Sequence, residues 1–310
     1  MDDIMDDMLA DLKKGKRRAI AKAITIIEND KAGAKKILKK IFKDTGNSVI
    51  IGITGPAGAG KSSLINKTVI SMRKLHTKPA VLAVDPTSHV TGGAILGDRV
   101  RMTESSDSGT YIRSIASRGA TGAVSDSLRN SIRILEYAGF DPIIIESVGA
   151  GQTEIEISEI ADITIVVFSP QTGDSIQAIK AGLTEIGDIY LVNKSDLDGA
   201  NQLYDALVDY IDTPEQKLTI LKTSTKKNSG ITQLAKTLKN MIVHSRQEKK
   251  NTDPIRLESE LRDIVLSSIK DRFGEMLNTD KAFLKYLKKL QARDIDPYDA
   301  ADKITKKMAV

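Results

Sequence analysis

The stretch Val49–Ser62 reads VIIGITGPAGAGKS and contains the pattern GxxxxGK[ST] from Gly55 to Ser62. The run Val49–Ile53 is apolar and rich in β-branched residues, which is typical of a buried strand, and helical spacing follows Ser62. A strand, a glycine-rich loop and a helix in this order form the context in which the pattern binds phosphate. With glycine at about 7% of residues, a chance match has a probability on the order of one in a hundred, so a phosphate site is favoured over an ordinary turn.

The residue types in this loop suit phosphate chemistry. Glycines allow backbone N–H groups to curl around phosphate oxygens, and the helix N-terminus adds positive potential. We expect Lys61 to bridge the β- and γ-phosphates and Ser62 to ligate Mg²⁺. The predicted nucleotide-binding residues here are Gly55, Pro56, Ala57, Gly58, Ala59, Gly60, Lys61, Ser62 and Ser63.

The composition of the 310 residues, 40% hydrophobic and 28% charged, is that of a globular protein and not of a disordered one. The 46 basic and 41 acidic residues are interspersed, so we expect no nucleic-acid partner. The absence of cysteine excludes disulfides and Cys-ligated metal centres within this chain. Its apolar runs are too short to span a membrane and its acidic start does not resemble a signal peptide, so we expect a cytoplasmic protein without membrane association.

Short apolar runs alternate with helical stretches through the middle of the sequence. Continuous apolar runs of this kind are buried on both faces, which predicts an α/β fold with a mostly parallel sheet flanked by helices. The predicted strands are Val49–Ile53, Ala80–Val84, Ile143–Ile145, Ile163–Phe168, Ile189–Val192 and Leu218–Leu221.

The sequence divides into three predicted parts: a helical segment over residues 1–46, a nucleotide-binding domain over 47–250 and a helical segment over 251–310. The polar stretch from Arg246 to Pro254 is interpreted as a linker before the last part. Apolar residues recur at helical spacing in both end segments, as at Ile20, Ile24 and Ile27. Such stripes fit packing onto the core and fit a subunit interface equally well.

A second motif, Asn193-Lys194-Ser195-Asp196, follows the strand Ile189–Val192 and fits NKxD. Asp196 can accept hydrogen bonds from N1–H and the 2-amino group of guanine, a donor pair that adenine lacks. At about 1.5–3 kcal/mol per charge-assisted bond, this predicts about a hundredfold or greater preference for GTP over ATP. We expect Lys194 to lie along the base, Asn193 to brace the loop and Ser224 to support the guanine carbonyl. A helix-capping loop is the alternative for the tetrapeptide, and its place downstream of the phosphate loop argues against that.

Three acidic residues are candidates for the metal site. Asp85 follows the strand Ala80–Val84, Asp98 lies in a glycine-rich segment, and Glu146 follows Ile143–Ile145. A carboxylate at the end of a strand beside the phosphate loop can ligate Mg²⁺ directly or through water. An Asp-Pro turn at Asp85 and a capping carboxylate at Glu146 are the structural alternatives. We predict Ser62, Asp85, Asp98 and Glu146 as the metal residues.

The segment Glu146–Gly149 stands where many GTPases have DxxG, whose glycine N–H contacts the γ-phosphate. Ala150 follows, where Ras-like enzymes carry the glutamine that orients water, and Gln152 lies two residues further on. The catalytic candidates are therefore Lys61, Glu146 and Gln152. We expect slow hydrolysis by the chain alone unless a partner reorganises this loop.

Longer stretches of the sequence closely resemble the MeaB/ArgK/MMAA family, densely from about Lys14 to Lys194. These stretches are Val84–Ser88, Thr91–Met102, Ile112–Ser114, Ala116–Gly119, Glu146–Gln152 and Gly173–Gly182, of which GGAILGDRVRM is the most specific. The resemblance implies a SIMIBI-class P-loop GTPase that binds GTP, GDP and Mg²⁺. It also implies a chaperone that gates adenosylcobalamin loading, and protects or reactivates an acyl-CoA mutase, chiefly methylmalonyl-CoA mutase. Members are typically homodimers to which C-terminal helices contribute.

Carried over by position, the resemblance assigns phosphate and Mg²⁺ to Lys61 and Ser62, metal ordering to Asp85, Asp98 and Glu146, and guanine to Asn193 and Asp196. It also implies that Pro170–Lys180 is an additional switch from which Lys180 reaches the nucleotide; a solvated helix lysine is the equal alternative.

Three other functions are alternatives for a sequence of this kind. A metallochaperone GTPase for nickel enzymes would carry Cys or His clusters, whereas this chain has no Cys and three scattered His residues. An ATPase or kinase linked to amino-acid transport conflicts with the guanine-reading Asp196. A non-enzymatic regulator that nucleotide merely toggles is compatible with slow hydrolysis.

Overall fold

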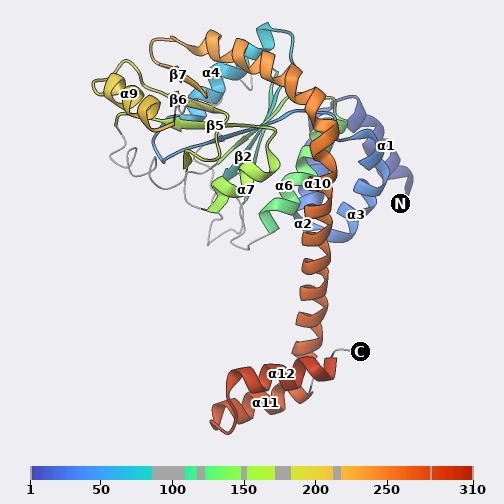
Figure 1. Ribbon diagram of the computed structural model, residues 1–310. Coiled ribbons are helices and arrows are strands. Elements are labelled where there is room, and N and C mark those ends of the chain that lie inside the picture. The colour runs from blue at the N-terminus through green and yellow to red at the C-terminus, as the bar shows by residue number, and fades with distance from the viewer. Residues whose placement is uncertain are drawn as a thin grey trace. The chain divides into compact units, whose positions relative to one another are not determined.

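The computed structural model describes residues 2–85, 109–116, 123–147, 152–171, 183–211, 218–279 and 281–308. In these ranges, seven strands form one parallel sheet of order β3-β2-β4-β1-β5-β6-β7 (Figure 1). The strands are β1 (Ile50–Thr54), β2 (Ala80–Asp85), β3 (Tyr111–Ala116), β4 (Ile143–Glu146), β5 (Ile163–Phe168), β6 (Ile189–Val192) and β7 (Thr219–Lys222). The predicted α/β fold with a parallel sheet is confirmed.

The helices follow the strands in the alternation that parallel connections require. They are α1 (Asp2–Lys13), α2 (Arg17–Asn29), α3 (Lys31–Ile41), α4 (Lys61–Lys74), α6 (Ala123–Tyr137), α7 (Gln152–Ile160), α9 (Ala200–Ile211), α10 (Ile231–Thr279), α11 (Lys281–Gln291) and α12 (Pro297–Met308), with a short 3₁₀ helix at Phe42–Asp44. The phosphate loop lies between β1, at the centre of the sheet, and α4. Loops at the carboxyl ends of such central strands are where α/β sheets bind ligands.

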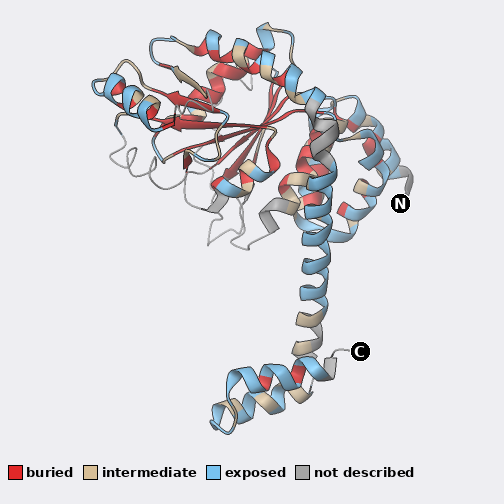
Figure 2. Cartoon of the chain, in the orientation of Figure 1, coloured by how far each residue is buried: buried red, intermediate tan, exposed pale blue. Residues whose placement is uncertain are grey.

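Both faces of the sheet are covered. On one face, α4 and the first part of α10 pack on a cluster that includes Ile51 and Ile165. On the other face, α2, α6 and α7 pack on Ile50 and Ile143, while α9 covers Phe168 and its neighbours. Figure 2 shows the strands buried almost throughout. Burial on both faces explains why these strands are continuous apolar runs in the sequence.

The edge strand β3 was not among the predicted strands. Its sequence, Tyr-Ile-Arg-Ser-Ile-Ala, mixes polar and apolar residues because an edge strand meets fewer neighbours. The Arg113 guanidinium in this strand binds the Glu28 carboxylate of α2 at 2.7 Å. Arg113 interrupts the apolar run, which is why the strand was not predicted. Its side chain attaches α2 to the edge of the sheet.

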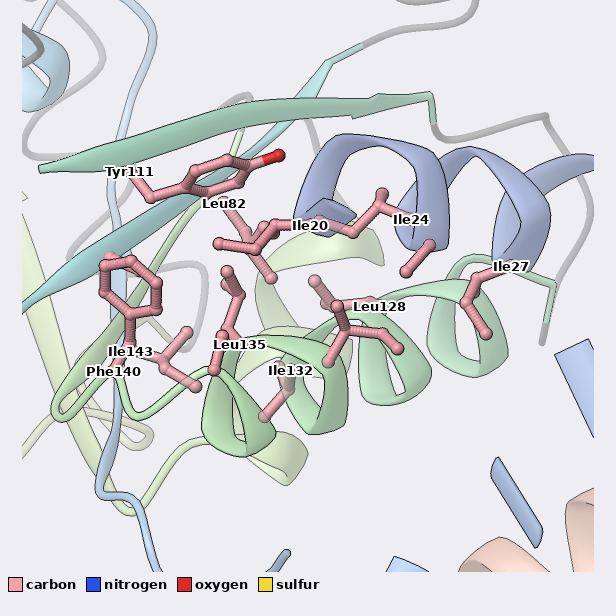
Figure 3. Close-up of a cluster of buried hydrophobic side chains, with 14 of the residues drawn as sticks. Ile20, Ile24, Ile27, Leu82, Tyr111, Leu128, Ile132, Leu135, Phe140 and Ile143 are labelled. Atoms are coloured by element: carbon pink, nitrogen blue, oxygen red, sulfur yellow. The ribbon is translucent and has the colours of Figure 1, made fainter. Parts of the chain in front are cut away.

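The helices α1 to α3 pack on the core. Ile20, Ile24 and Ile27 of α2 lie against Leu128, Ile132 and Leu135 of α6, as Figure 3 shows. The apolar residues of the N-terminal segment were expected either to pack onto the core or to form a subunit interface. The structure shows that they pack onto the core. Residues 1–253 form one compact unit that contains both these helices and the sheet.

Residues 254–310 form a second compact unit. The stretch from Arg246 to Pro254, interpreted as a linker, is helical: α10 runs through it with Pro254 inside the helix. The boundary between the two compact units falls at its end, between Asp253 and Pro254. The Gln, Glu and Lys residues of this stretch are good helix formers, and a single proline removes one backbone donor without ending the helix. Ala300 and Ile304 of α12 are buried in this unit. Among the described residues, no helix is long and apolar enough to cross a lipid bilayer.

Candidate functional site

The phosphate loop depends on glycine at the positions where its backbone turns. Gly55, Gly58 and Gly60 have φ angles of 137°, 79° and 88°, in the region that favours glycine. A Cβ atom at Gly55 would lie 2.1 Å from the carbonyl oxygen of Val167, which no rearrangement of side chains can relieve. The loop is therefore packed directly against the backbone of β5.

Lys61, the first residue of α4, folds back over this loop. Its Nζ donates to the carbonyl oxygens of Gly55 at 2.7 Å and Pro56 at 3.2 Å. The side chain is buried. These bonds hold an ammonium group among the backbone groups that are expected to surround phosphate.

Ser62 is joined to the end of β4. Its Oγ donates to Oε1 of Glu146 at 2.6 Å, and Glu146 is buried. A hydroxyl and a carboxylate at one point form a pair of hard oxygen donors, which is the donor type that Mg²⁺ prefers. No group of three or more His, Asp or Glu side chains suited to a metal lies together in the described ranges. The pair fits an ion whose other ligands are water and phosphate.

Asn193 attaches the loop that is predicted to read the base to the phosphate loop. Its buried Nδ2 donates to the carbonyl oxygen of Ala59 at 2.9 Å, and its Oδ1 accepts from the Thr223 hydroxyl at 3.2 Å. A Cβ at Gly60 would lie 2.6 Å from Asn193 Nδ2. Asn193 thus braces three loops, those after β1, β6 and β7, from a single buried side chain.

Asp196 and Ser224 are in direct contact. The Ser224 hydroxyl donates to Oδ1 of Asp196, and this bond is the main cause that holds the pKa of Asp196 below its usual value. Lys194 has a positive φ of 55°, and its Nζ donates to Oε1 of Gln171 at 3.0 Å. Ser224 thus contacts the carboxylate that is expected to read guanine, a link that the sequence did not indicate.

Several predicted site residues lie wholly or partly outside the described residues. Asp98, Gly149 and Lys180 lie outside the described residues. Asp85 ends β2 and Gln152 begins α7, but their side chains lie outside what the structure describes. Of the predicted loop residues, Ala57, Gly58 and Ser63 are exposed beside the buried Ala59.

Sequence reasoning missed Glu154, which is buried in the first turn of α7. Burial raises the pKa of its carboxyl group, and the charge of Lys61 opposes that rise. The sequence did contain a signal: Glu154 precedes Ile157 and Ala161 at helical spacing, which places an acidic residue on the apolar face of a helix.

Comparisons with known proteins agree on one family. The family model described as methylmalonyl-CoA mutase-associated GTPase MeaB matches residues 20–278. A relative from Pyrococcus horikoshii, named as a GTPase, is 41% identical over 98% of this chain and 98% of its own length. The GTPase ArgK of Escherichia coli is 38% identical over 60% of this chain and 58% of its own length. A crystal structure of a LAO/AO transport system kinase covers 100% of this chain and 99% of its own, with a TM-score of 0.69 and 22% identity, and so shares the fold.

Proposed function

This chain belongs to the MeaB family of methylmalonyl-CoA mutase-associated GTPases, and we propose that it is a Mg²⁺-dependent switch serving an adenosylcobalamin-dependent acyl-CoA mutase. It is a P-loop GTPase by the same membership. The observation that carries the proposal is the contact between Ser62 and Glu146, which brings a hydroxyl and a carboxylate together beside the phosphate loop.

The proposed chemistry uses the residues around that contact. Lys61 stabilises charge on the β- and γ-phosphates, and Ser62 and Glu146 hold Mg²⁺ with Asp85 and Asp98. Asn193, Lys194, Asp196 and Ser224 form the guanine site. When bound, Mg²⁺ supplies a positive charge that offsets the negative charge of the phosphates. Hydrolysis yields GDP and phosphate and is slow in the isolated chain, with Gln152 and Gly149 completing the site when a partner is bound.

The proposed client is an acyl-CoA mutase, in preference to an enzyme of nickel chemistry or of amino-acid transport, because the family description names methylmalonyl-CoA mutase. In this role the GTPase gates adenosylcobalamin loading and protects or reactivates the mutase, with Lys180 contacting nucleotide in the complex. The test measures GTP hydrolysis with and without purified methylmalonyl-CoA mutase from the same source. A rate that the mutase leaves unchanged, together with no co-purification in either nucleotide state, would contradict the chaperone role.

A homodimer is the second part of the proposal. Its support is a row of exposed apolar residues on α10 within residues 254–310, including Leu257, Leu261, Ile264, Val265 and Ile269. Exposed apolar area of this extent is typical of a surface that a partner covers. A second copy of the chain fits because both copies present the same apolar row, as a two-fold interface requires.

Lys61→Ala tests the phosphate site. Loss of the ammonium group should weaken GTP binding by at least tenfold, whereas Lys67→Ala, in the same helix, should leave binding unchanged. Calorimetry with GTP and ATP measures both the loss and the base preference. Equal GTP affinity of the Lys61 variant and the parent chain would overturn the assignment, and tighter binding of ATP would overturn the guanine site.

A further inference from the structure

The helix α7 runs antiparallel to β1 and ends beside the start of that strand. Asp162, just after α7, accepts from the Ile50 N–H at 2.8 Å and donates its own N–H to the Ile50 carbonyl at 2.8 Å. Ile157 lies further along, where a Cβ added to Gly52 would meet its Cγ2 at 2.8 Å. Going from the C-terminal end of α7 toward its N-terminal end, the helix therefore follows β1 from its start toward the phosphate loop.

Glu154 lies one helical turn beyond Ile157 on the same side of α7. Residues three apart are neighbours on one face of a helix, so Glu154 continues the line toward Thr54 and Gly55 at the end of β1. The Gly55 carbonyl is one of the two acceptors of the Lys61 ammonium. The acidic side chain is thus buried on the side of the phosphate loop, and Lys61 is the cation that acts on its charge.

A carboxylate in this position is costly for the fold. Burial raises the pKa of Glu154, so its ionised form is less stable in the folded chain than in the unfolded one. At pH values above the raised pKa, the cost is fully present, and it disappears as pH falls below the usual carboxyl value. Glutamine has almost the same shape without the charge. A residue that costs stability where a neutral residue would fit indicates a functional role.

We propose that Glu154 competes with the nucleotide phosphates for Lys61 and thereby speeds the release of GDP. Its negative charge attracts the ammonium group and repels phosphate in a region screened poorly by water. Glu154 is a positioning residue in this scheme, since it acts through Lys61 and does not touch the reacting atoms. The inference rests on the phosphate site proposed above.

The test compares three variants of the full chain. Glu154→Gln removes the charge, Glu154→Asp keeps it, and Glu156→Gln makes the same neutral change two residues away in the same helix. Dissociation of a fluorescent GDP analogue is followed by stopped flow, and GDP affinity is measured by calorimetry. We expect Glu154→Gln to slow dissociation and tighten GDP binding by about three- to tenfold, with Glu156→Gln unchanged and Glu154→Asp closer to the parent chain.

The outcomes separate the two proposals. Failure of the parent chain to bind GDP would overturn the phosphate site itself. Normal binding by the parent chain, with GDP released by Glu154→Gln as fast as or faster than by the parent, would overturn only the role of Glu154. A Glu154→Asp variant as tight as Glu154→Gln would show that packing, not charge, sets the rate and would also overturn it. Thermal unfolding adds a check: Glu154→Gln should melt at or above the temperature of the parent chain, and a variant that does not fold contradicts the proposed cost.

Discussion

At the scale of single residues, the hydrogen bond between Ser224 and Asp196 bears on the proposed preference for guanine. In the proposed guanine site, Asp196 acts as a hydrogen-bond acceptor, which requires its ionised form. The Ser224 hydroxyl donates to this carboxylate and lowers its pKa, while Lys226 and Lys227 contribute smaller effects of the same sign. Ser224 therefore favours the ionised form of Asp196 and fixes the direction of its carboxylate.

Replacing Ser224 with Ala should weaken GDP binding by about five- to tenfold, because one hydrogen bond to a charged group is lost. ATP binding should change less, so the preference for guanine falls. Ser195→Ala is the control, since the Ser195 hydroxyl has no hydrogen bond among the described residues. Calorimetry with GDP, GTP and ATP gives the comparison, and an unchanged ratio of affinities would contradict the role of Ser224.

The same substitution predicts a shift in pH dependence. The pKa of Asp196 is lowered in the folded chain, so guanine recognition should persist as pH falls through the usual carboxyl range and fail only below it. Without Ser224, the largest cause of that lowering is absent. GDP affinity of Ser224→Ala should therefore decline at a higher pH than that of the parent chain. Titrations between about pH 3 and 5, around the usual value of an aspartate carboxyl group, measure this difference.

At the scale of elements, the close approach of α7 to β1 depends on Gly52. A Cβ there would lie 2.8 Å from Ile157 Cγ2 and 3.0 Å from Ala161 Cβ, so a side chain must push the helix outward. Gly52→Ala should reduce the free energy of unfolding by about 1–3 kcal/mol, the usual cost of overpacking. It should also alter GDP release, because α7 carries Glu154.

The control for this prediction is Gly274→Ala in α10. An added Cβ at Gly274 meets nothing within 4 Å, and alanine favours a helix. This variant should be as stable as the parent chain or more stable by about 0.5–1 kcal/mol. Thermal and urea unfolding measure both variants, and a Gly52→Ala variant of parental stability would show that α7 adjusts without cost.

Sequence patterns predicted the strands that are buried on both faces. They missed the edge strand, in which polar and apolar residues are mixed. The runs at β5 and β6 are almost entirely apolar because both faces are covered, so these strands could be predicted. The edge strand β3 could not, since its Arg113 serves an ion pair that only the fold creates. In the site, motif spacing indicated Lys61, Ser62 and Asn193. Motif spacing did not indicate Glu154, because the position of Glu154 relative to Lys61 depends on how α7 packs along β1.

At the scale of the whole molecule, residues 1–253 carry the proposed nucleotide site and residues 254–310 carry exposed apolar side chains. Leu261 is 63% exposed and Val265 is 47% exposed, and as residues four apart they share one face of α10. In a homodimer, burying a leucine side chain contributes about 1.5–3 kcal/mol. An unpaired carboxylate placed there would remove this contribution and add a desolvation cost.

The pair of substitutions Leu261→Glu and Val265→Glu should therefore convert the dimer into a monomer, as measured by sedimentation equilibrium. Ser259→Glu adds the same charge to the same helix at about 200° from Leu261, given 100° per residue, and should leave the dimer intact. GDP affinity should stay near the parental value, because the proposed nucleotide-binding residues belong to the other unit. A parent chain that sediments as a monomer, or a double variant that remains dimeric, would show that this apolar row does not join two copies.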